Sequence, residues 1–174
     1  MNHQIQMRFR GFKSIVIFDI DNCIADDHWR QPLIDWDLSG DLRYARYNDA
    51  MDKDKLCNGE IFKLFMELGH TPVFFSGRPE AYRGKTALWL ADNLSYTQNL
   101  FLRPNGTKGL TPRALKERML RNIEEECIAR DIEVVAAFDD IPAVVEMYRE
   151  LRIPAAVLAI HSDLSGAYQP GDLK

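Results

Sequence analysis

The sequence predicts an α/β fold in which a five-stranded parallel sheet carries helices on both faces. Three observations lead to this prediction: short β-branched and aromatic runs recur along the chain, segments of helical periodicity lie between them, and no repeat or Pro/Gly/Ser-rich linker divides the sequence. Short continuous apolar runs are typical of strands that are buried on both faces. Because strands that alternate with helices favour right-handed crossovers, the sheet is expected to be parallel.

Five segments are predicted to be strands, because each is a short apolar run rich in Val, Ile, Leu, Ala or Phe. In chain order they are residues 14–18, 72–75, 100–102, 133–138 and 155–160. The carboxyl ends of parallel strands meet at one edge of the sheet, and ligands of such sheets bind just beyond that edge. Functional side chains are therefore expected directly after the strands.

Four helices are predicted between the strands. Apolar side chains at positions 61, 64, 65 and 68 follow i, i+3, i+4, i+7 spacing, which indicates a helix that ends near Gly69. Pro79 is expected to open a second helix that runs toward Asp92, since proline suits the first helical position. Pro112 is expected to open a long third helix, and residues 144–151 a fourth.

Composition restricts the classes of protein to which the chain can belong. The 174 residues fit one domain, taken as 1–174, and 46% of them are hydrophobic, which excludes a wholly disordered chain. A formal net charge of −4 excludes a nucleic-acid binder that acts through overall positive charge, so any polyanion has to meet a local basic cluster. The sequence lacks a membrane-length apolar run, a secretory leader and a disulfide framework, and we therefore expect a cytoplasmic protein without a membrane partner.

The segment 26–56 is expected to be a lid or cap that is inserted after the first strand. It has little periodicity, and a segment of this length and character is more often a functional lid than a passive connector. It contains four aromatic side chains: Trp29, Trp36, Tyr44 and Tyr47. They either stack on a nucleobase or pack as the small core of the lid itself, and the sequence leaves both possibilities open.

The first predicted strand leads into two acidic residues, Asp19 and Asp21. Residues i and i+2 project to the same side of an extended chain, so their carboxylates can converge on one small volume. Such a pair is costly unless a cation lies between the groups or one of them is protonated, and both conditions suit phosphoryl transfer. Taken alone, the pair is equally compatible with an exposed acidic turn.

Further polar residues follow the other strands. Ser76 and Gly77 offer a hydroxyl group and a close backbone approach to an anion, although they also fit a simple turn. Asp139 and Asp140 follow the fourth strand and suit a hard cation such as Mg²⁺, although Asp140 can instead only cap the next helix. Lys116 near the start of the long helix either balances these acidic groups or is an ordinary surface lysine.

The order of these groups resembles the haloacid dehalogenase (HAD) superfamily of phosphatases, which have a Rossmann-like fold. The resemblance implies that Asp19 is the nucleophile that becomes an aspartyl phosphate and that Asp21 is the general acid and base. It also implies that Ser76 and Lys116 are the second and third catalytic motifs. It further implies a Mg²⁺ cofactor that is held by Asp19, Asp139, Asp140 and Asp21, the last through its backbone carbonyl.

Several spaced motifs over residues 14–160 resemble the 3′-phosphatase domain of phage polynucleotide kinase and its stand-alone phage relatives. They are Ser76-Gly-Arg-Pro-Glu80, Tyr82, Trp89-Leu90, Leu102-Arg-Pro104, Lys116, Phe138-Asp-Asp140 and Val144-Val-Glu-Met-Tyr-Arg149. The resemblance implies a polynucleotide 3′-phosphate substrate in the cytoplasm of a bacterium or a phage-infected cell.

Four residues near the rim of the predicted site are expected to bind the substrate: Gly77, Arg78, Arg103 and Arg113. Guanidinium groups suit the recognition of phosphate, and a glycine lets the backbone approach an anion. In the first motif, Asn22-Cys23 stands where the family usually has Gly-Thr. The geometry is expected to survive this change, because asparagine tolerates a left-handed backbone better than most residues.

Other phosphate-transfer classes fit the sequence less well. A P-loop kinase needs glycine five residues before Gly84, where Pro79 stands, and a cysteine phosphatase needs arginine at a spacing that no cysteine here has. A nucleoside monophosphate phosphatase of the 5′-nucleotidase type remains the alternative, and a non-catalytic module on the same fold is more remote. The sequence does not indicate an oligomeric state.

Overall fold

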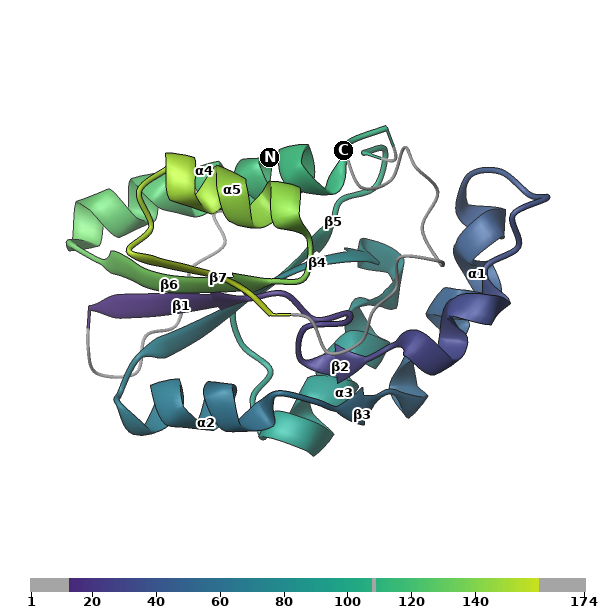
Figure 1. The fold of residues 1–174 in the computed structure, drawn as a ribbon, viewed down its shortest axis with the longest axis horizontal. Coiled ribbons are helices and arrows are strands. Elements are labelled where there is room, and N and C mark those ends of the chain that lie inside the picture. Colours follow the sequence, from purple (N-terminus) through teal and green to yellow (C-terminus); the bar gives the residue numbers. More distant parts are fainter. Residues whose placement is uncertain (1–12, 108, 160–174) are drawn as a thin grey trace.

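A computed structural model describes residues 13–107 and 109–159, and Figure 1 shows them as a central sheet between helices. The strands of this sheet are β1 Ser14–Phe18, β4 Thr71–Pro79, β5 Leu100–Arg103, β6 Glu133–Asp139 and β7 Ala155–Leu158. They are all parallel and lie in the order β5-β4-β1-β6-β7. The predicted five-stranded parallel sheet is therefore confirmed, except that Ile160 of the expected last strand and the ends 1–12 and 161–174 of the expected domain lie outside the described residues.

Helices cover both faces of the sheet, as predicted. They are α2 Gly59–Glu67, α3 Arg83–Leu94, α4 Pro112–Arg130 and α5 Pro142–Glu150. The first two lie on one face and the last two on the other (Figure 1). Pro79 ends β4 opposite Arg103 and does not open a helix. The strand continues past its apolar run as far as Pro79. The predicted helix therefore begins later, at Arg83, after a short 3₁₀ helix, Glu80–Tyr82.

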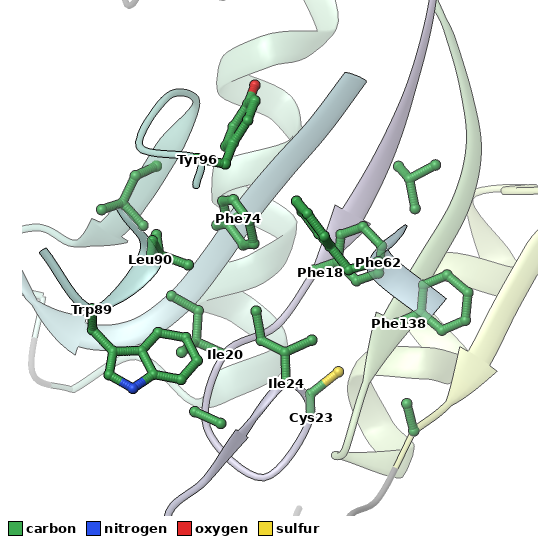
Figure 2. Close-up of a cluster of buried hydrophobic side chains, with 14 of the residues drawn as sticks. Phe18, Ile20, Cys23, Ile24, Phe62, Phe74, Trp89, Leu90, Tyr96 and Phe138 are labelled. Atoms are coloured by element: carbon green, nitrogen blue, oxygen red, sulfur yellow. The ribbon is translucent and has the colours of Figure 1, made fainter. Parts of the chain in front are cut away.

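The alternation of side chains along β1 divides the core into two clusters, because successive strand residues point to opposite faces. Ile15 and Ile17 pack with side chains of α4 and α5, whereas Val16 and Phe18 pack with side chains of α2 and α3. Figure 2 shows the second cluster, in which Phe18 stacks on Phe138 with the ring centroids 5.3 Å apart. Phe18 is the last residue of β1, so this aromatic contact anchors the chain directly before Asp19.

The cap predicted at residues 26–56 begins and ends in a pair of short strands. β2 Ala25–Asp26 and β3 Lys55–Leu56 pair in antiparallel fashion. Between them lie the 3₁₀ helix η1 His28–Leu33, the helix α1 Asp41–Asp49 and the 3₁₀ helix η2 Met51–Lys53. Figure 1 places α1 at the end of the sheet where β1 leads into the cap. None of the helices in the described part of the chain has both the length and the apolar character of a membrane span.

Asp27 lies completely buried in the cap. One of its carboxylate oxygens accepts hydrogen bonds from Gln31 and Tyr47, whereas the other, Oδ1, has no hydrogen-bond partner among the described residues. Burial raises the pKa of Asp27 from 3.8 to about 6, and the charge of Asp21 adds to the rise. The folded state therefore binds a proton at Asp27 more tightly than the unfolded state does, and ionising this carboxyl destabilises the cap.

The variant Asp27→Asn is expected to raise the free energy of unfolding at pH 8, because asparagine keeps an acceptor for both donors and carries no charge. The folded-state pKa is the higher one, so the wild-type protein loses stability as pH rises from about 4 to 6. The gain in the variant is expected to be about 1 to 3 kcal/mol above pH 6 and to shrink toward pH 4. Thermal unfolding at several pH values measures it, with Asp52→Asn as the exposed control. A lower melting temperature of Asp27→Asn at pH 8 would contradict this account.

Candidate active site

Three buried carboxylates meet at the edge of the sheet where β1 and β6 end side by side. Asp19 follows β1, Asp139 ends β6, and Asp140 comes next. Phe18 and Phe138 are partners across the two strands, and the backbone N–H of Asp19 donates to the carbonyl oxygen of Phe138 at 2.9 Å. One carboxylate oxygen from each aspartate lies within 4.8 Å of the other two. Adjacent strands thus bring together acidic groups that are far apart in the sequence.

Lys116 supplies a positive charge to this cluster. The hydroxyl of Thr111 caps the start of α4, and Lys116 lies in the second turn, only 3% exposed. Its ammonium group donates to the Asp19 carboxylate and, at 2.7 Å, to Oδ2 of Asp139. Burial alone lowers the pKa of Lys116, but Asp139 and Asp19 raise it well above its ordinary value. The lysine is therefore a fixed cation within the site and not a surface residue.

The charge that remains on the cluster suits a hard cation. Burial raises the pKa of Asp19 to about 7, Lys116 opposes this rise, and Asp139 adds to it. Burial likewise raises the pKa of Asp140 well above its ordinary value, and the charges of Asp19 and Asp139 contribute. One ammonium group thus leaves three carboxylates incompletely neutralised. Since Mg²⁺ binds carboxylate oxygens and keeps several waters, this donor set fits it.

The carboxylate of Asp21 does not belong to that group but lies against two arginines. Arg78 donates to its Oδ1 from Nε at 3.0 Å and from Nη2 at 2.7 Å, and Arg30 of the cap donates to the same oxygen. Burial would raise the pKa of Asp21, but the guanidinium groups of Arg78 and Arg30 lower it to about 2. Asp21 is therefore ionised at neutral pH. These contacts engage the Asp21 carboxylate, and they leave free the backbone carbonyl through which Asp21 is predicted to hold the metal.

Two residues of the cap, Arg30 and Asp54, complete this arrangement, and neither belongs to the predicted site residues. Arg30 is fully buried, and its Nε and Nη2 donate to the carboxylate oxygens of Asp54 at 2.7 and 2.8 Å. Arg78 donates to Asp54 as well, at 2.8 Å. No pattern in the sequence indicates either residue, because Arg30 lies in a short 3₁₀ helix and Asp54 in the connection between η2 and β3. A buried arginine inside an otherwise polar insertion is recognisable only in the folded chain.

A cavity of about 480 Å³ opens above the carboxylates, between the cap and the sheet edge. Asp19, Asp21, Lys116 and Asp140 line its floor. The cap contributes a wall that includes Trp36, Tyr44 and Tyr47, and the opposite wall comes from the loop and first turn that begin α4. The three aromatic rings also contact one another edge to face, at 6.5 Å between Trp36 and Tyr44 and 6.4 Å between Tyr44 and Tyr47. The rings therefore both pack within the cap and face the cavity.

Three of the four predicted substrate-binding residues lie at the cavity, and the fourth does not. Gly77, Arg78 and Arg103 line the cavity, and Nη1 of buried Arg78 has no hydrogen-bond partner among the described residues. Ser76 is fully buried, and its hydroxyl oxygen accepts from the backbone N–H of Arg78 at 3.1 Å. Arg113 does not line this cavity, because its guanidinium donates to Glu150 and to a backbone carbonyl of α5.

The residues that replace the usual Gly-Thr keep the first motif in place. Asn22 has a φ of 56°, the left-handed conformation that was expected, and its Nδ2 donates to Oδ2 of Asp140 at 3.2 Å. Cys23 is buried in the core cluster of Figure 2. Burial raises the pKa of the Cys23 thiol well above its ordinary value, with the charge of Asp19 adding to the rise. The thiol is therefore neutral and is not a nucleophile.

The parallel sheet, its inserted cap and the acidic residues at the strand ends define an α/β phosphatase with a Rossmann-like HAD fold. Residues 13–160 match the family described as the polynucleotide kinase PNKP phosphatase domain. The chain belongs to this family, and its phosphatase class and the predicted HAD fold are confirmed.

Solved structures with the same fold are also known. One is titled "Structure of the Pnkp1/Rnl/Hen1 RNA repair complex"; it is 21% identical, has a TM-score of 0.62, and is matched over 92% of this chain and 45% of that chain. A second, titled "Structure of Pnkp1/Rnl/Hen1 complex", is 21% identical with a TM-score of 0.57, over 91% and 48% of the two chains. The chain thus spans about half the length of these relatives. No curated protein matches it.

Proposed function

We propose that the protein is a Mg²⁺-dependent phosphomonoesterase that acts on polynucleotide 3′-phosphate ends through an aspartyl-phosphate intermediate. The observation that carries this proposal is the placement of Asp19 and Asp21 on the floor of one cavity, with Lys116 beside the first. Asp19 has its carboxylate in the acidic cluster, while Asp21 has its own among arginines. Two neighbouring carboxylates in different surroundings suit different chemical roles.

In the proposed first step, a carboxylate oxygen of Asp19 attacks phosphorus in line, and the bond from phosphorus to the ester oxygen breaks. The leaving oxygen takes a proton from Asp21. The arginines keep Asp21 ionised in the free protein, so it takes up this proton from solvent water only once the substrate is bound. The negative charge of an arriving phosphate favours that proton uptake, because a like charge raises the pKa of a carboxyl group.

In the proposed second step, water attacks phosphorus of the aspartyl phosphate and Asp21 accepts the proton of that water. Inorganic phosphate leaves and Asp19 is restored. Lys116 stabilises negative charge next to Asp19. Nη1 of Arg78 has no hydrogen-bond partner in the part of the chain that the structure describes, and we assign it as a donor to a phosphoryl oxygen. Ser76 fixes the backbone at Arg78. Mg²⁺ at Asp19, Asp139 and Asp140, with the backbone carbonyl of Asp21, would supply Lewis-acid stabilisation of the phosphoryl charge.

The proposed substrate class is supported by the walls of the cavity. The aromatic rings of Trp36 and Tyr44 offer a surface for a nucleobase, and such stacking accepts any base. Arg103 lines the cavity as well, held by the carbonyl oxygens of Gly77, Thr107 and Leu110. Membership of the polynucleotide kinase phosphatase family supports a nucleic-acid end as the natural substrate.

A mononucleotide phosphatase remains the second candidate, and one observation favours it. The cap forms a wall of the cavity, and the resulting volume of about 480 Å³ is in the range of small-molecule sites. A cap that encloses one nucleotide would select nucleoside 5′- or 3′-monophosphates. A polynucleotide needs an open path for the rest of the strand.

A panel of substrates tests the proposal and separates the two candidates. Phosphate release is measured with Mg²⁺ for a 3′-phosphorylated oligonucleotide, nucleoside 3′- and 5′-monophosphates, and p-nitrophenyl phosphate. The proposal expects the highest kcat/KM for the oligonucleotide. A preference of at least about tenfold for a monophosphate would transfer the assignment to the nucleotidase. Absence of hydrolysis for every substrate would leave a non-catalytic module and overturn the proposal.

The variant Trp36→Ala is expected to weaken the binding of nucleotide substrates selectively. Loss of one stacking surface costs about 1 to 3 kcal/mol per base, which corresponds to a rise in KM of about 5- to 150-fold. Hydrolysis of 2-glycerol phosphate, which has no base, is expected to be unchanged. The control is Leu42→Ala, an exposed residue of α1 that does not line the cavity. Equal effects of Trp36→Ala on both substrates would show that the ring only packs the cap.

A further inference from the structure

Asp54 is a buried carboxylate at the base of the cap, between η2 and β3, and it lies outside the cavity lining. Its two oxygens accept hydrogen bonds from Arg30, from Arg78 and from the indole N–H of Trp29, the last at 3.1 Å. Its backbone carbonyl accepts the indole N–H of Trp89 in α3 at 2.8 Å. The backbone carbonyl of Asp54 is therefore fixed to the core, and its carboxylate is fixed to the two arginines.

Arg30, Arg78, Asp21 and Asp54 form a network of salt bridges. Arg30 and Arg78 each donate to Asp54 and also to Asp21, so each guanidinium group bridges the two carboxylates. The side chains of both arginines and of Asp54 are at most 1% exposed, whereas that of Asp21 is 20% exposed and faces the cavity. The charges balance, two positive against two negative. Asp54 forms the buried side of this arrangement, and Asp21 forms the side that faces the cavity.

Removal of one carboxylate from such an arrangement affects the other. A guanidinium group is a planar, rigid fork, so the bond that it makes on one edge sets the direction of the next. Without Asp54, one negative charge would remain for two buried arginines, and both would turn toward Asp21 or toward water. The Asp21 carboxylate would then lose the orientation that directs it toward the leaving oxygen.

We propose that Asp54 is a positioning residue for the phosphatase reaction: through Arg30 and Arg78 it holds Asp21 in the orientation for proton transfer. The proposal rests on the proposed function above and assigns Asp54 no contact with substrate. In the step concerned, the bond from Asp19 to phosphorus forms, the ester bond breaks, and the proton of Asp21 moves to the ester oxygen. Asp54 gains and loses nothing in that step.

The dependence of the rate on the leaving group tests this role. An aryl phosphate with an electron-poor ring expels its oxygen with little need for a proton, whereas a nucleoside 3′-phosphate expels an alkoxide that needs one. The value of kcat/KM covers substrate binding and the steps up to the first irreversible one, so it includes transfer of phosphorus to Asp19 and leaves out the later hydrolysis of the aspartyl phosphate. The experiment compares wild type, Asp54→Asn and the control Asp52→Asn on p-nitrophenyl phosphate and on a 3′-phosphorylated oligonucleotide. Asp52 is a cap residue, exposed and 3.8 Å from Lys85.

We expect Asp54→Asn to lose about 100-fold in kcat/KM on the oligonucleotide and less than about fivefold on the aryl phosphate. Asp52→Asn is expected to match wild type on both. A variant that folds incompletely loses both activities by the same factor, so the ratio of the two values does not depend on the folded fraction. Equal losses on the two substrates would overturn the proposal, because a purely structural role produces them.

A second comparison uses the background Asp21→Asn, in which the proton donor is already absent. If Asp54 acts through Asp21, adding Asp54→Asn changes kcat/KM on the oligonucleotide by less than about threefold, because coupled residues are not additive. A further 100-fold loss would overturn the proposal. Wild type that hydrolyses neither substrate would overturn the proposed function, and this inference with it. If wild type is active but Asp54→Asn leaves the ratio of the two kcat/KM values unchanged, this inference is overturned and the proposed function is not.

Discussion

Replacement of Asp19 with alanine is expected to reduce phosphate release by at least about 10⁴-fold, since the nucleophile of the proposed covalent step is lost. Hydrolysis of a phosphate monoester without a catalyst is so slow that the barrier has to fall by something like 20 kcal/mol. Hydrogen bonds alone do not supply this, so positioning, electrostatic stabilisation and an attacking oxygen have to share it. Asp19 is the carboxylate placed beside Lys116 on the cavity floor.

The matched variant Asp19→Asn separates chemistry from folding. Asparagine keeps the size of the side chain, and Lys116 keeps its 2.7 Å partner Asp139, so the melting temperature is expected to stay within a few degrees of wild type. Acid quenching with a ³²P-labelled substrate is expected to trap labelled protein in wild type and none in either variant. Retention of wild-type turnover by Asp19→Ala would refute the assignment of the nucleophile.

Removal of divalent metal is expected to have the second-largest effect, with a loss of activity of at least about 100-fold that Mg²⁺ restores. The reason is the charge of the site: the carboxylates of Asp19, Asp139 and Asp140 are buried together, and Lys116 contacts the first two of them. Phosphate release after chelation, and again after stepwise addition of Mg²⁺, measures this requirement.

Asp139→Asn provides a readout that does not need turnover. A ligand that binds only the folded state raises its stability, so Mg²⁺ is expected to raise the melting temperature of wild type and to raise it far less in Asp139→Asn. Asp131→Asn is the matched control, because Asp131 is an almost fully exposed aspartate 3.8 Å from Lys13. Equal stabilisation of wild type and Asp139→Asn by Mg²⁺ would place the metal elsewhere.

Much of the fold follows from local sequence, as β1 illustrates. Its five residues are all apolar except the first, and their short length and β-branched content favour a strand that is buried on both faces. The two acidic groups that follow β1 and β6 were expected near one edge because parallel strands end together. Their adjacency depends on β1 and β6 being neighbours in the sheet, and the sequence does not contain that strand order in readable form.

The arginines show where sequence reasoning failed, and the reason is electrostatic. Arg113 is predicted to bind the substrate because it lies near the rim of the predicted site and a guanidinium group suits phosphate. Its long side chain instead pairs with Glu150 of α5, and only tertiary packing decides which carboxylate is nearest. Arg30 and Asp54 were missed for the same reason, since each is defined by its partner across the cap and neither by its neighbours in the chain.

The cap is joined to the sheet domain by the short β2 and β3 pair, yet it carries Arg30 and Asp54 into contact with Asp21. The cap therefore contributes to the surroundings of Asp21 as well as to a wall of the cavity. A chimera that exchanges these residues for the insertion of another phosphatase has to bring an equivalent arginine and acid with it. An insertion without such a pair would leave Asp21 with Arg78 as its remaining arginine partner among the contacts described above.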